Sequence, residues 1–349
     1  METRIVKLNQ NNMDSEILAE AGRIIMSGGL VAFPTETVYG LGGDAFNPDS
    51  SKKIYAAKGR PSDNPLIVHI AQIEDLEKVA VDIPQTAYAL ANKFWPGPLT
   101  MILKKAAKVP KETTGGLDTV AVRMPSHPVA AAFIEAAGGF VAAPSANKSG
   151  RPSPTEGKYV VEDLNNEIEM IIDGGLSDIG LESTIVDLTC DTVMILRPGY
   201  ITKEDIAEVT QKVEIDKTIL DDSSGIAPKA PGMKYRHYAP KGDLTIVHGE
   251  KENVVDYING EIKKHSAGGE KTGVIATDET KDLYRADAVK DIGSREDDES
   301  IARNLFRILR ELDDEEVEVI YTEGFGTEGI AMATMNRLLK AAGHKEVNV

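Results

Sequence analysis

Four cationic side chains stand beside predicted strand ends in a 349-residue chain whose net charge is −17. Lys58 and Arg60 come just before the apolar run "LIVHI". Arg123 ends the run "TVAVR", and Arg197 ends "VMILR". Guanidinium groups match the geometry of carboxylates and phosphates. Any one of these cations could simply pair with a surface acid, but four of them beside hydroxyl-rich or proline-broken loops favour a pocket for an anionic ligand.

Hydroxyl and amide side chains follow several of the same predicted strands. In "PTETVYGLGG" two threonines precede three glycines that would let a backbone approach a ligand closely. The loop "APSANKSGRPSPT" and the stretch "GLESTIVDL" add further polar groups. Serine near proline often forms only turns and caps, and a lone histidine in a strand, such as His69, is often a core residue. The polar candidates are Thr37, Asn64, Ser145, Asn147, Ser149, Ser153, Ser183 and Thr184.

Composition and motif content remove several classes of protein. Phosphate-loop, dinucleotide-binding, zinc-protease and nucleophile-elbow motifs are missing, and the six histidines show no metal-ligand spacing. Neither half of the chain is basic, which argues against a nucleic-acid platform. The single cysteine, Cys190, excludes an internal disulfide and fits a reducing compartment. With no run typical of a signal peptide or a membrane helix, we expect a cytoplasmic protein.

The first 210 residues alternate short apolar runs with helical patterns. The helix predicted over 14–29 begins at Asp14 and ends near Gly28. Strands are predicted for RIVKL, LVAF, LIVHI, LTMILKK, TVAVRM, FVAA, MIIDGG, STIVDL and VMILRPG, and helices for PQTAYALANKFW and HPVAAAFIEAAGG. Several strands follow one another with no room for a helix, so we expect a mixed sheet in a domain of residues 1–210.

Residues 211–243 are rich in Pro, Gly and Ser, which predicts an interdomain linker. Its stretch "KYRHYAP" holds aromatic and cationic side chains, including Tyr235 and Tyr238, and suggests a lid over a bound ligand; a passive tether is the alternative. Residues 244–349 alternate strands and helices with short connections, which predicts a smaller, doubly wound, Rossmann-like α/β domain. The acidic run "DDEE" at 313–316 is expected in a solvated loop.

Six motifs together resemble the threonylcarbamoyl-AMP synthase family. FPTETVYGLG, KGRPSDNPL, VAVRMPSHP, PSANKSGRPSPT, STIVD and RPG occur in the family's order and at its separations. The resemblance covers residues ~15–205 as a YrdC-like catalytic domain, and the linker with the following α/β domain resembles the long, two-domain form. Each motif alone is weak, but the joint match is highly specific.

The resemblance implies a nucleotidyltransferase reaction. L-threonine, bicarbonate or CO2, and ATP accompanied by Mg²⁺ would give L-threonylcarbamoyladenylate and pyrophosphate. The product would pass to a downstream transferase complex that makes N6-threonylcarbamoyladenosine at position 37 of tRNAs reading ANN codons. Neither a protein side chain that binds the metal nor direct tRNA binding is expected.

The family's site residues carry over to matching positions in this sequence. The implied threonine contacts are Thr37, His69, Arg123 and Ser183. The implied ATP contacts are Lys58, Arg60, Asn64, Thr119, Ala143, Ser145, Asn147, Ser153, Arg197 and Tyr238. Lys58 would face the phosphates, and Lys58 and Arg60 would act as the catalytic cations.

Two other functions stay open on the sequence alone. An RNA-binding module of the YrdC-like class would suit a tRNA pathway, although the acidic balance and the lack of interleaved aromatic and basic residues argue against it. A related carbamoyl-adenylate enzyme, as in hydrogenase maturation, usually carries acylphosphatase and zinc-finger segments that are missing here.

Overall fold

The computed structural model describes residues 2–216, 219 and 237–349. The chain divides into two compact units. The first unit contains residues 1–149, 153–178 and 182–234, and the second contains residues 150–152, 179–181 and 235–349. Two short segments within the predicted N-terminal domain of residues 1–210 therefore belong to the second unit by their contacts. Among the described helices, none has the length and apolar character needed to cross a membrane.

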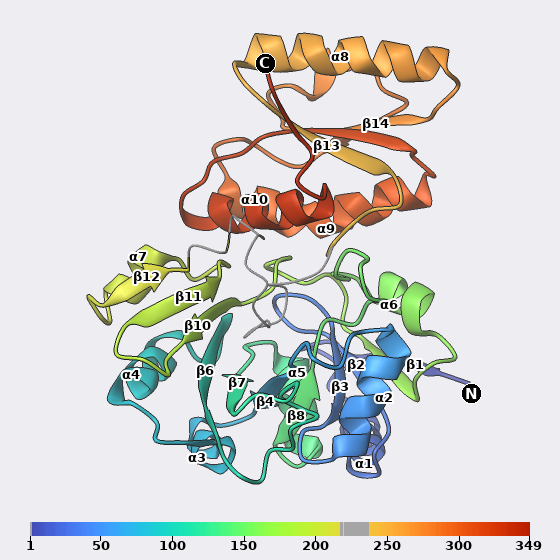
Figure 1. The fold of residues 1–349 in the computed structure, drawn as a ribbon. Helices are drawn as coiled ribbons and strands as arrows, with labels where there is room; N and C mark the ends of the chain where they lie inside the picture. The colour runs from blue at the N-terminus through green and yellow to red at the C-terminus, as the bar shows by residue number, and fades with distance from the viewer. Residues whose placement is uncertain (1, 217–218, 220–236) are drawn as a thin grey trace. The chain divides into compact units, whose positions relative to one another are not determined.

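A mixed sheet of twelve strands forms the centre of the first unit (Figure 1). Its order is β1-β9-β2-β3-β8-β4-β7-β6-β10-β11-β12, with β5 paired to β6. The strand β4 runs parallel to β7, whereas β7 runs antiparallel to β6. The mixed sheet predicted from the sequence is confirmed. The strands are β1 (Arg4–Lys7), β2 (Val31–Phe33), β3 (Gly40–Asp44), β4 (Ile67–Ile70), β5 (Ala80–Val81), β6 (Leu99–Lys105), β7 (Thr119–Arg123), β8 (Phe140–Ala143), β9 (Met170–Asp173), β10 (Thr184–Asp187), β11 (Val193–Arg197) and β12 (Val213–Ile215).

Helices cover both faces of this sheet because successive strand residues point to opposite sides. Val31 and Phe33 join the core formed with α1 and α5, whereas Ala32 joins the core on the other face. The predicted cap of α1 is confirmed, since the Asp14 carboxylate accepts from two backbone N–H groups of its first turn. The helices are α1 (Ser15–Met26), α2 (Pro48–Lys58), α3 (Leu76–Val79), α4 (Gln85–Phe94), α5 (Pro128–Ala136), α6 (Gly157–Leu164) and α7 (Lys203–Ala207).

The glycine-rich end of "PTETVYGLGG" forms the central strand β3. A Cβ atom on Gly40 would lie 2.9 Å from Cζ of Phe33, and one on Gly42 would lie 2.8 Å from Cγ1 of Val141. These glycines therefore let neighbouring core side chains pack over the strand. At these two positions core side chains fill the space that a Cβ atom would need, so packing requires glycine there; the approach of a ligand to this stretch stays a prediction.

The second unit is built on a parallel sheet of order β15-β14-β16-β13-β17. In Figure 1, α8 lies on one face of this sheet, and α9 and α10 lie on the other. The predicted doubly wound domain is confirmed. Its elements are β13 (Asp243–His248), α8 (Lys251–Ala267), β14 (Thr272–Ala276), β15 (Ala288–Asp291), α9 (Asp298–Asp314), β16 (Val319–Glu323), α10 (Gly329–Ala341) and β17 (Glu346–Asn348).

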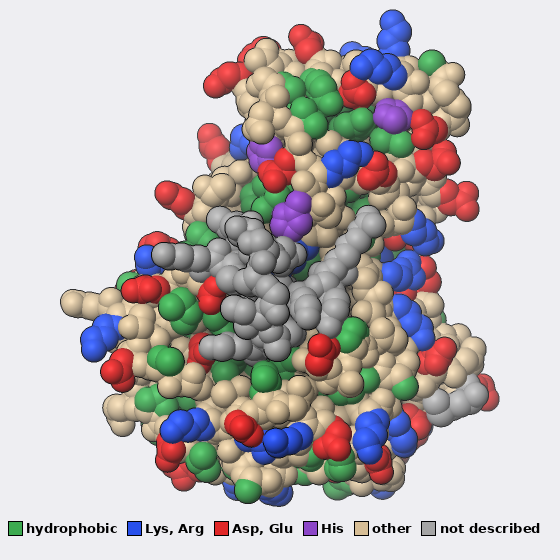
Figure 2. Space-filling view, viewed as in Figure 1, with side chains coloured by type: hydrophobic (Ala, Val, Ile, Leu, Met, Phe, Trp, Pro, Cys, Tyr) green, Lys and Arg blue, Asp and Glu red, His purple; other side chains and the backbone are tan. Residues whose placement is uncertain are grey.

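The acidic run at 313–316 differs from its prediction. Asp313 lies within α9 and is buried, and its Oδ1 accepts from the backbone N–H of Lys241 at 2.7 Å. The expectation of a solvated loop is therefore wrong for Asp313, because its carboxylate caps a neighbouring chain segment. On the face drawn in Figure 2, acidic (red) and basic (blue) side chains are interspersed.

The predicted linker, residues 211–243, is only partly described. The strand β12 falls within this range and pairs with β11. Most of the predicted lid, including Tyr235, lies outside the described residues. Tyr238 belongs to the second unit, where its ring centroid lies 5.1 Å from that of Phe306 in α9.

Candidate active site

Arg123 is the centre of a buried polar cluster in the first unit. It ends β7 and is 4% exposed. Its Nη1 donates to Oγ1 of Thr37 at 2.9 Å, and its Nε donates to the carbonyl of Gly97 at 3.3 Å. Its Nη2 lies 2.7 Å from Oε1 of Glu36. The guanidinium is thus held on three sides at the end of a central strand.

Glu36 forms a charged pair with Arg123. Burial by itself would raise the pKa of this carboxyl, but the charge and hydrogen bonding of Arg123, together with backbone hydrogen bonds from Ser126 and Glu36 itself, lower it further than burial raises it. The pKa of Glu36 therefore lies below its usual range, and the pair is ionised at neutral pH. A buried pair of this kind is costly to break, because either partner alone would be an uncompensated charge.

His69 lies beside Arg123 on the neighbouring strand. The register of β4 and β7 pairs the two residues directly. Burial, together with the positive charge of Arg123, lowers the pKa of His69 to about 3. Its ring is therefore neutral, and its Nδ1 lies 3.1 Å from the carbonyl oxygen of Ile67. Since a carbonyl only accepts, Nδ1 carries the proton and Nε2 is the acceptor nitrogen.

Ser183 joins the same cluster through β6. Thr100 pairs with Arg123 in the register of β6 and β7, and its hydroxyl lies 2.7 Å from Oγ of Ser183. Arg197, at the end of β11, donates from Nη2 to that Oγ at 3.1 Å and from Nε to the Ser183 carbonyl at 3.0 Å. The structure therefore brings the four predicted threonine contacts together, with Arg197 attached to them.

Lys58 anchors the loop that contains Ser145 and Asn147. It ends α2 and is almost fully buried. Its Nζ donates to the carbonyl of Ser145 at 2.5 Å and to the carbonyl of Asn147. Oγ of Ser145 in turn donates to Oδ1 of Asn147 at 2.5 Å. An isolated bridge between Gly40 and Ser145 ties this loop to β3. Lys58 therefore holds the backbone of the loop in place, in addition to any role toward a ligand.

Arg60 and Asn64 form a neighbouring turn. Arg60 donates from Nε to the Asn64 carbonyl at 3.2 Å and from Nη2 to the Pro65 carbonyl at 3.1 Å. The side-chain oxygen of Asn64 is buried and has no hydrogen-bond partner among the described residues. A buried polar atom without a partner is costly, so this oxygen marks a place where a ligand donor would be stabilising.

The remaining predicted ATP contacts lie in several places. Thr119 begins β7 four residues before Arg123, which puts the two roughly 13 Å apart on the same face of the strand. Ala143 pairs with Ile67 of β4. Ser153 donates to Oε1 of Glu182 at 2.6 Å. Tyr238 lies in the second unit.

The prediction from sequence missed three buried polar residues of the site. Glu36 lies inside the motif "PTETVYG". A carboxylate in this motif could have been predicted to pair with one of the four cationic side chains, and the structure pairs it with Arg123. Glu182 also lies in a quoted stretch, next to Ser183. Thr100 gave no signal, because a single threonine in the strand pattern "LTMILKK" is ordinary.

The fold and this cluster define a two-domain α/β protein with a buried cationic and hydroxyl-rich site for a small anionic ligand. A family model described as telomere recombination matches residues 23–199, and one described as threonylcarbamoyl-AMP synthase, C-terminal domain, matches residues 201–343. The chain belongs to the threonylcarbamoyl-AMP synthase family.

Relatives and a solved structure cover almost the whole chain. A threonylcarbamoyl-AMP synthase of Pyrococcus abyssi is 48% identical over 99% of this chain and 100% of its own length. One of Bacillus subtilis is 46% identical over 95% of this chain and 94% of its own length. The structure of P. abyssi Sua5 complexed with L-threonine has a TM-score of 0.94 at 47% identity, covering 99% of this chain and 100% of that one.

Proposed function

We propose that this protein is an L-threonylcarbamoyladenylate synthase of the nucleotidyltransferase class. Two full-length relatives carry the name threonylcarbamoyl-AMP synthase, and the similar P. abyssi structure holds L-threonine. The substrates are L-threonine, ATP and bicarbonate or CO2, and the products are threonylcarbamoyl-AMP and pyrophosphate. The RNA-binding alternative gains no support from any observation on the site.

The observation that carries the proposal is the donor geometry of Arg123. A guanidinium has five N–H donors. Its hydrogen bonds to Gly97 and Thr37 use two of them, and its Nη2 lies in the ion pair with Glu36. At least one N–H group on each terminal nitrogen remains for a ligand. Two such donors can form the fork that binds a carboxylate in bidentate fashion, and the threonine carboxylate is the ligand group we assign to it.

Neutral His69 and the hydroxyls of Thr37 and Ser183 surround this fork. They supply both donors and acceptors for the hydroxyl and amino groups of threonine. Because these groups are buried, a substrate that lacks the hydroxyl would leave some of them unpaired. The site should therefore select threonine over valine more strongly than over serine, which lacks only a methyl group.

The chemistry needs placement and charge stabilisation rather than a strong base. The threonine amine adds to CO2 and loses a proton to give a carbamate. A carbamate oxygen then attacks the α-phosphorus of ATP, and pyrophosphate leaves with its bonding electron pair. Lys58 and Arg60 are the cations we assign to the phosphates, with the loop of Ser145 and Asn147 cradling the nucleotide.

Mg²⁺ and the downstream partners belong to the same proposal. No group of three or more His, Cys, Asp or Glu side chains that could hold a metal lies within the described ranges. Mg²⁺ would enter bound to ATP, where it neutralises phosphate charge. The labile product passes to a tRNA-modifying transferase complex in the cytoplasm, where tRNA is used.

The test combines binding and turnover. Calorimetry on the full chain should show threonine binding that Arg123→Met weakens at least tenfold, with ATP affinity nearly unchanged. The matched control is Arg4→Met, which removes an exposed arginine paired with Glu20. Pyrophosphate release with bicarbonate should be far faster with threonine than with valine. Equal release with both amino acids would refute the assignment of the pocket.

A further inference from the structure

A cavity at the carboxyl edge of the second sheet is separate from the site described above. The adjacent parallel strands β13 and β16 end side by side there. The chain leaves β13 for α8 on one face of the sheet and leaves β16 for α10 on the opposite face (Figure 1). Two neighbouring strands whose connections diverge in this way form a topological switch point, where open α/β sheets bind ligands.

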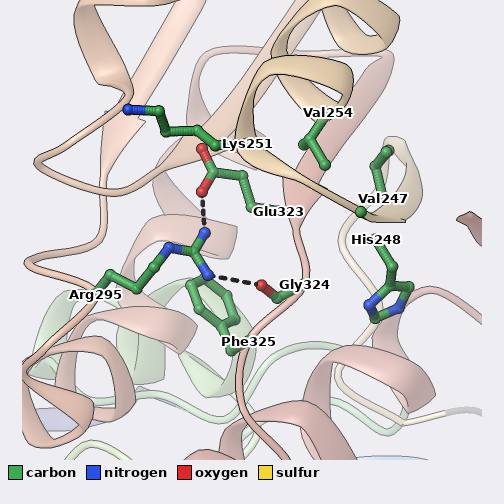
Figure 3. A pocket seen from close by; sticks show the side chains of 9 residues that line it. Val247, His248, Lys251, Val254, Arg295, Glu323, Gly324 and Phe325 are labelled. Carbon is green, nitrogen blue, oxygen red and sulfur yellow. Dashed lines mark hydrogen bonds and ion pairs between the residues drawn. The ribbon is translucent and has the colours of Figure 1, made fainter. Parts of the chain in front are cut away.

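The crevice at this switch point is an actual cavity of about 360 Å³. That volume lies near the lower end of the roughly 300–1,000 Å³ typical of small-molecule sites, which suits a ligand of mononucleotide size and not a dinucleotide. Figure 3 shows its walls, where the core residues Val247 and Val254 lie on one side and Arg295 lies along Phe325 on the other. The cavity is thus apolar on one side and charged on the other.

Arg295 and Phe325 form a flat platform in this wall. Nη2 of Arg295 pairs with Oε2 of Glu323, and Nη1 donates to the Gly324 carbonyl at 3.1 Å. The guanidinium carbon lies 5.6 Å from the centroid of the Phe325 ring. Two fixed contacts and the ring hold the guanidinium in one plane, yet the side chain keeps 45% exposure. Such a surface stacks against a planar ring.

Glu323 holds the platform of Arg295 and Phe325 in place. It is buried, and its Oε1 accepts from the hydroxyls of Thr280 and Tyr284. Burial and the charge of Glu323 raise the pKa of Tyr284, so this hydroxyl stays protonated and donates. Both carboxylate oxygens are occupied by protein donors, and the charge of Glu323 is balanced by Arg295. Glu323 therefore sets the position of Arg295.

The positive charge left over at the cavity belongs to Lys251. It is the first residue of α8, is exposed, and forms no hydrogen bond or ion pair with any residue in the described part of the chain. The other basic lining residue, His248, is bonded to Glu346. The side chain of Glu250 does not cap α8, so the N-cap residue does not cover the backbone N–H groups of the first turn beside Lys251. The acidic Glu252 of this turn does not line the cavity.

We propose that this cavity binds a small organic phosphate with a flat ring, of mononucleotide size. The phosphate lies at Lys251 and the N-terminal end of α8. The ring lies against the platform of Arg295 and Phe325. The inference does not rest on the proposed synthase activity, since every residue it uses lies in the second unit.

Hydrogen–deuterium exchange on the full chain tests the site directly, with AMP, adenosine and inorganic phosphate as separate probes. AMP should slow exchange in peptides covering 247–254 and 323–325. Adenosine and inorganic phosphate should each do so at least tenfold less effectively, because each lacks one half of the ligand. Any protection of peptides in 1–210 reports the other site, so the two sites are read separately in one experiment.

Charge reversal at one residue gives the matched comparison. Lys251→Glu should weaken AMP protection of these peptides at least tenfold and leave peptides in 1–210 unchanged. Lys263→Glu, which reverses an exposed charge three turns further along the same helix, should leave both unchanged. The proposal is overturned if millimolar AMP leaves 247–254 and 323–325 unprotected, if Lys251→Glu has no effect, or if adenosine alone protects as well as AMP.

Discussion

Replacing Glu36 by glutamine should destabilise the first unit in a way that depends on Arg123. Both side chains are almost fully buried, and their charged atoms lie 2.7 Å apart. Removing one partner of a buried pair costs about 3–5 kcal/mol. Glutamine keeps a hydrogen-bond acceptor, so we expect the lower figure, about 3 kcal/mol. At roughly 2–4 °C per kcal/mol for a unit of this size, the melting temperature should fall by about 6–12 °C.

A double-mutant cycle separates this pairing from other effects of the substitution. In an Arg123→Met background Glu36 is a buried, unpaired charge, so Glu36→Gln should be neutral or stabilising there. Urea unfolding followed by circular dichroism would give the four free energies. A loss of similar size in both backgrounds would refute the pairing. Because the pKa of Glu36 is lowered from 4.5, its contribution is complete above pH 4.5 and fades as the pH falls below it.

Three further substitutions test other parts of the structure. Lys58→Met leaves the carbonyls of Ser145 and Asn147 without their donor, and should raise KM for ATP by roughly 10–100-fold, whereas exposed Lys52→Met should not. His69 has a folded-state pKa of about 3 against an ordinary 6.5. The free energy of unfolding should therefore not depend on the titration of His69 above pH 6.5. Below pH 6.5 it should decrease by up to about 1.4 kcal/mol per pH unit. In His69→Gln, the free energy of unfolding measured with urea should change less with pH between pH 6 and 4 than in the unmodified protein. An unchanged pH dependence would contradict this. Arg310→Met removes two buried hydrogen bonds to the Pro152 carbonyl, of 3.0 and 2.7 Å, and should cost the second unit about 1–3 kcal/mol in thermal unfolding, an effect that exposed Arg285→Met should not reproduce.

The strands could be predicted from the sequence because short-range patterns determine them, and the threonine cluster because six motifs together resemble those of the threonylcarbamoyl-AMP synthase family. Apolar runs such as "LTMILKK" form strands at the predicted residues. Motif order was enough to group Thr37 with Arg123, which the structure joins by a hydrogen bond. The strand prediction rests on local composition, and the grouping of Thr37 with Arg123 rests on several motifs at once.

Long-range packing explains the features that the sequence did not reveal. The glycines of β3 resembled a ligand loop, and only the rings and methyl groups packed over them show why glycine is needed. Asp313 resembled a solvated residue, but it accepts from the N–H of Lys241, 72 positions away in the chain. The role of Lys58 toward Ser145 depends likewise on a contact 87 positions apart. Such partners are set by the tertiary fold and not by neighbours in sequence.

Mass spectrometry of the reaction product tests the central claim most directly. The full chain is incubated with ATP, L-threonine, bicarbonate and Mg²⁺, and the mixture is analysed at once because the adenylate is labile. We predict threonylcarbamoyl-AMP and an equal amount of pyrophosphate, both dependent on threonine and bicarbonate and both lost in Arg123→Met, but not in Arg4→Met. Absence of the adenylate with active, folded protein, or pyrophosphate release that does not require threonine, would contradict the account.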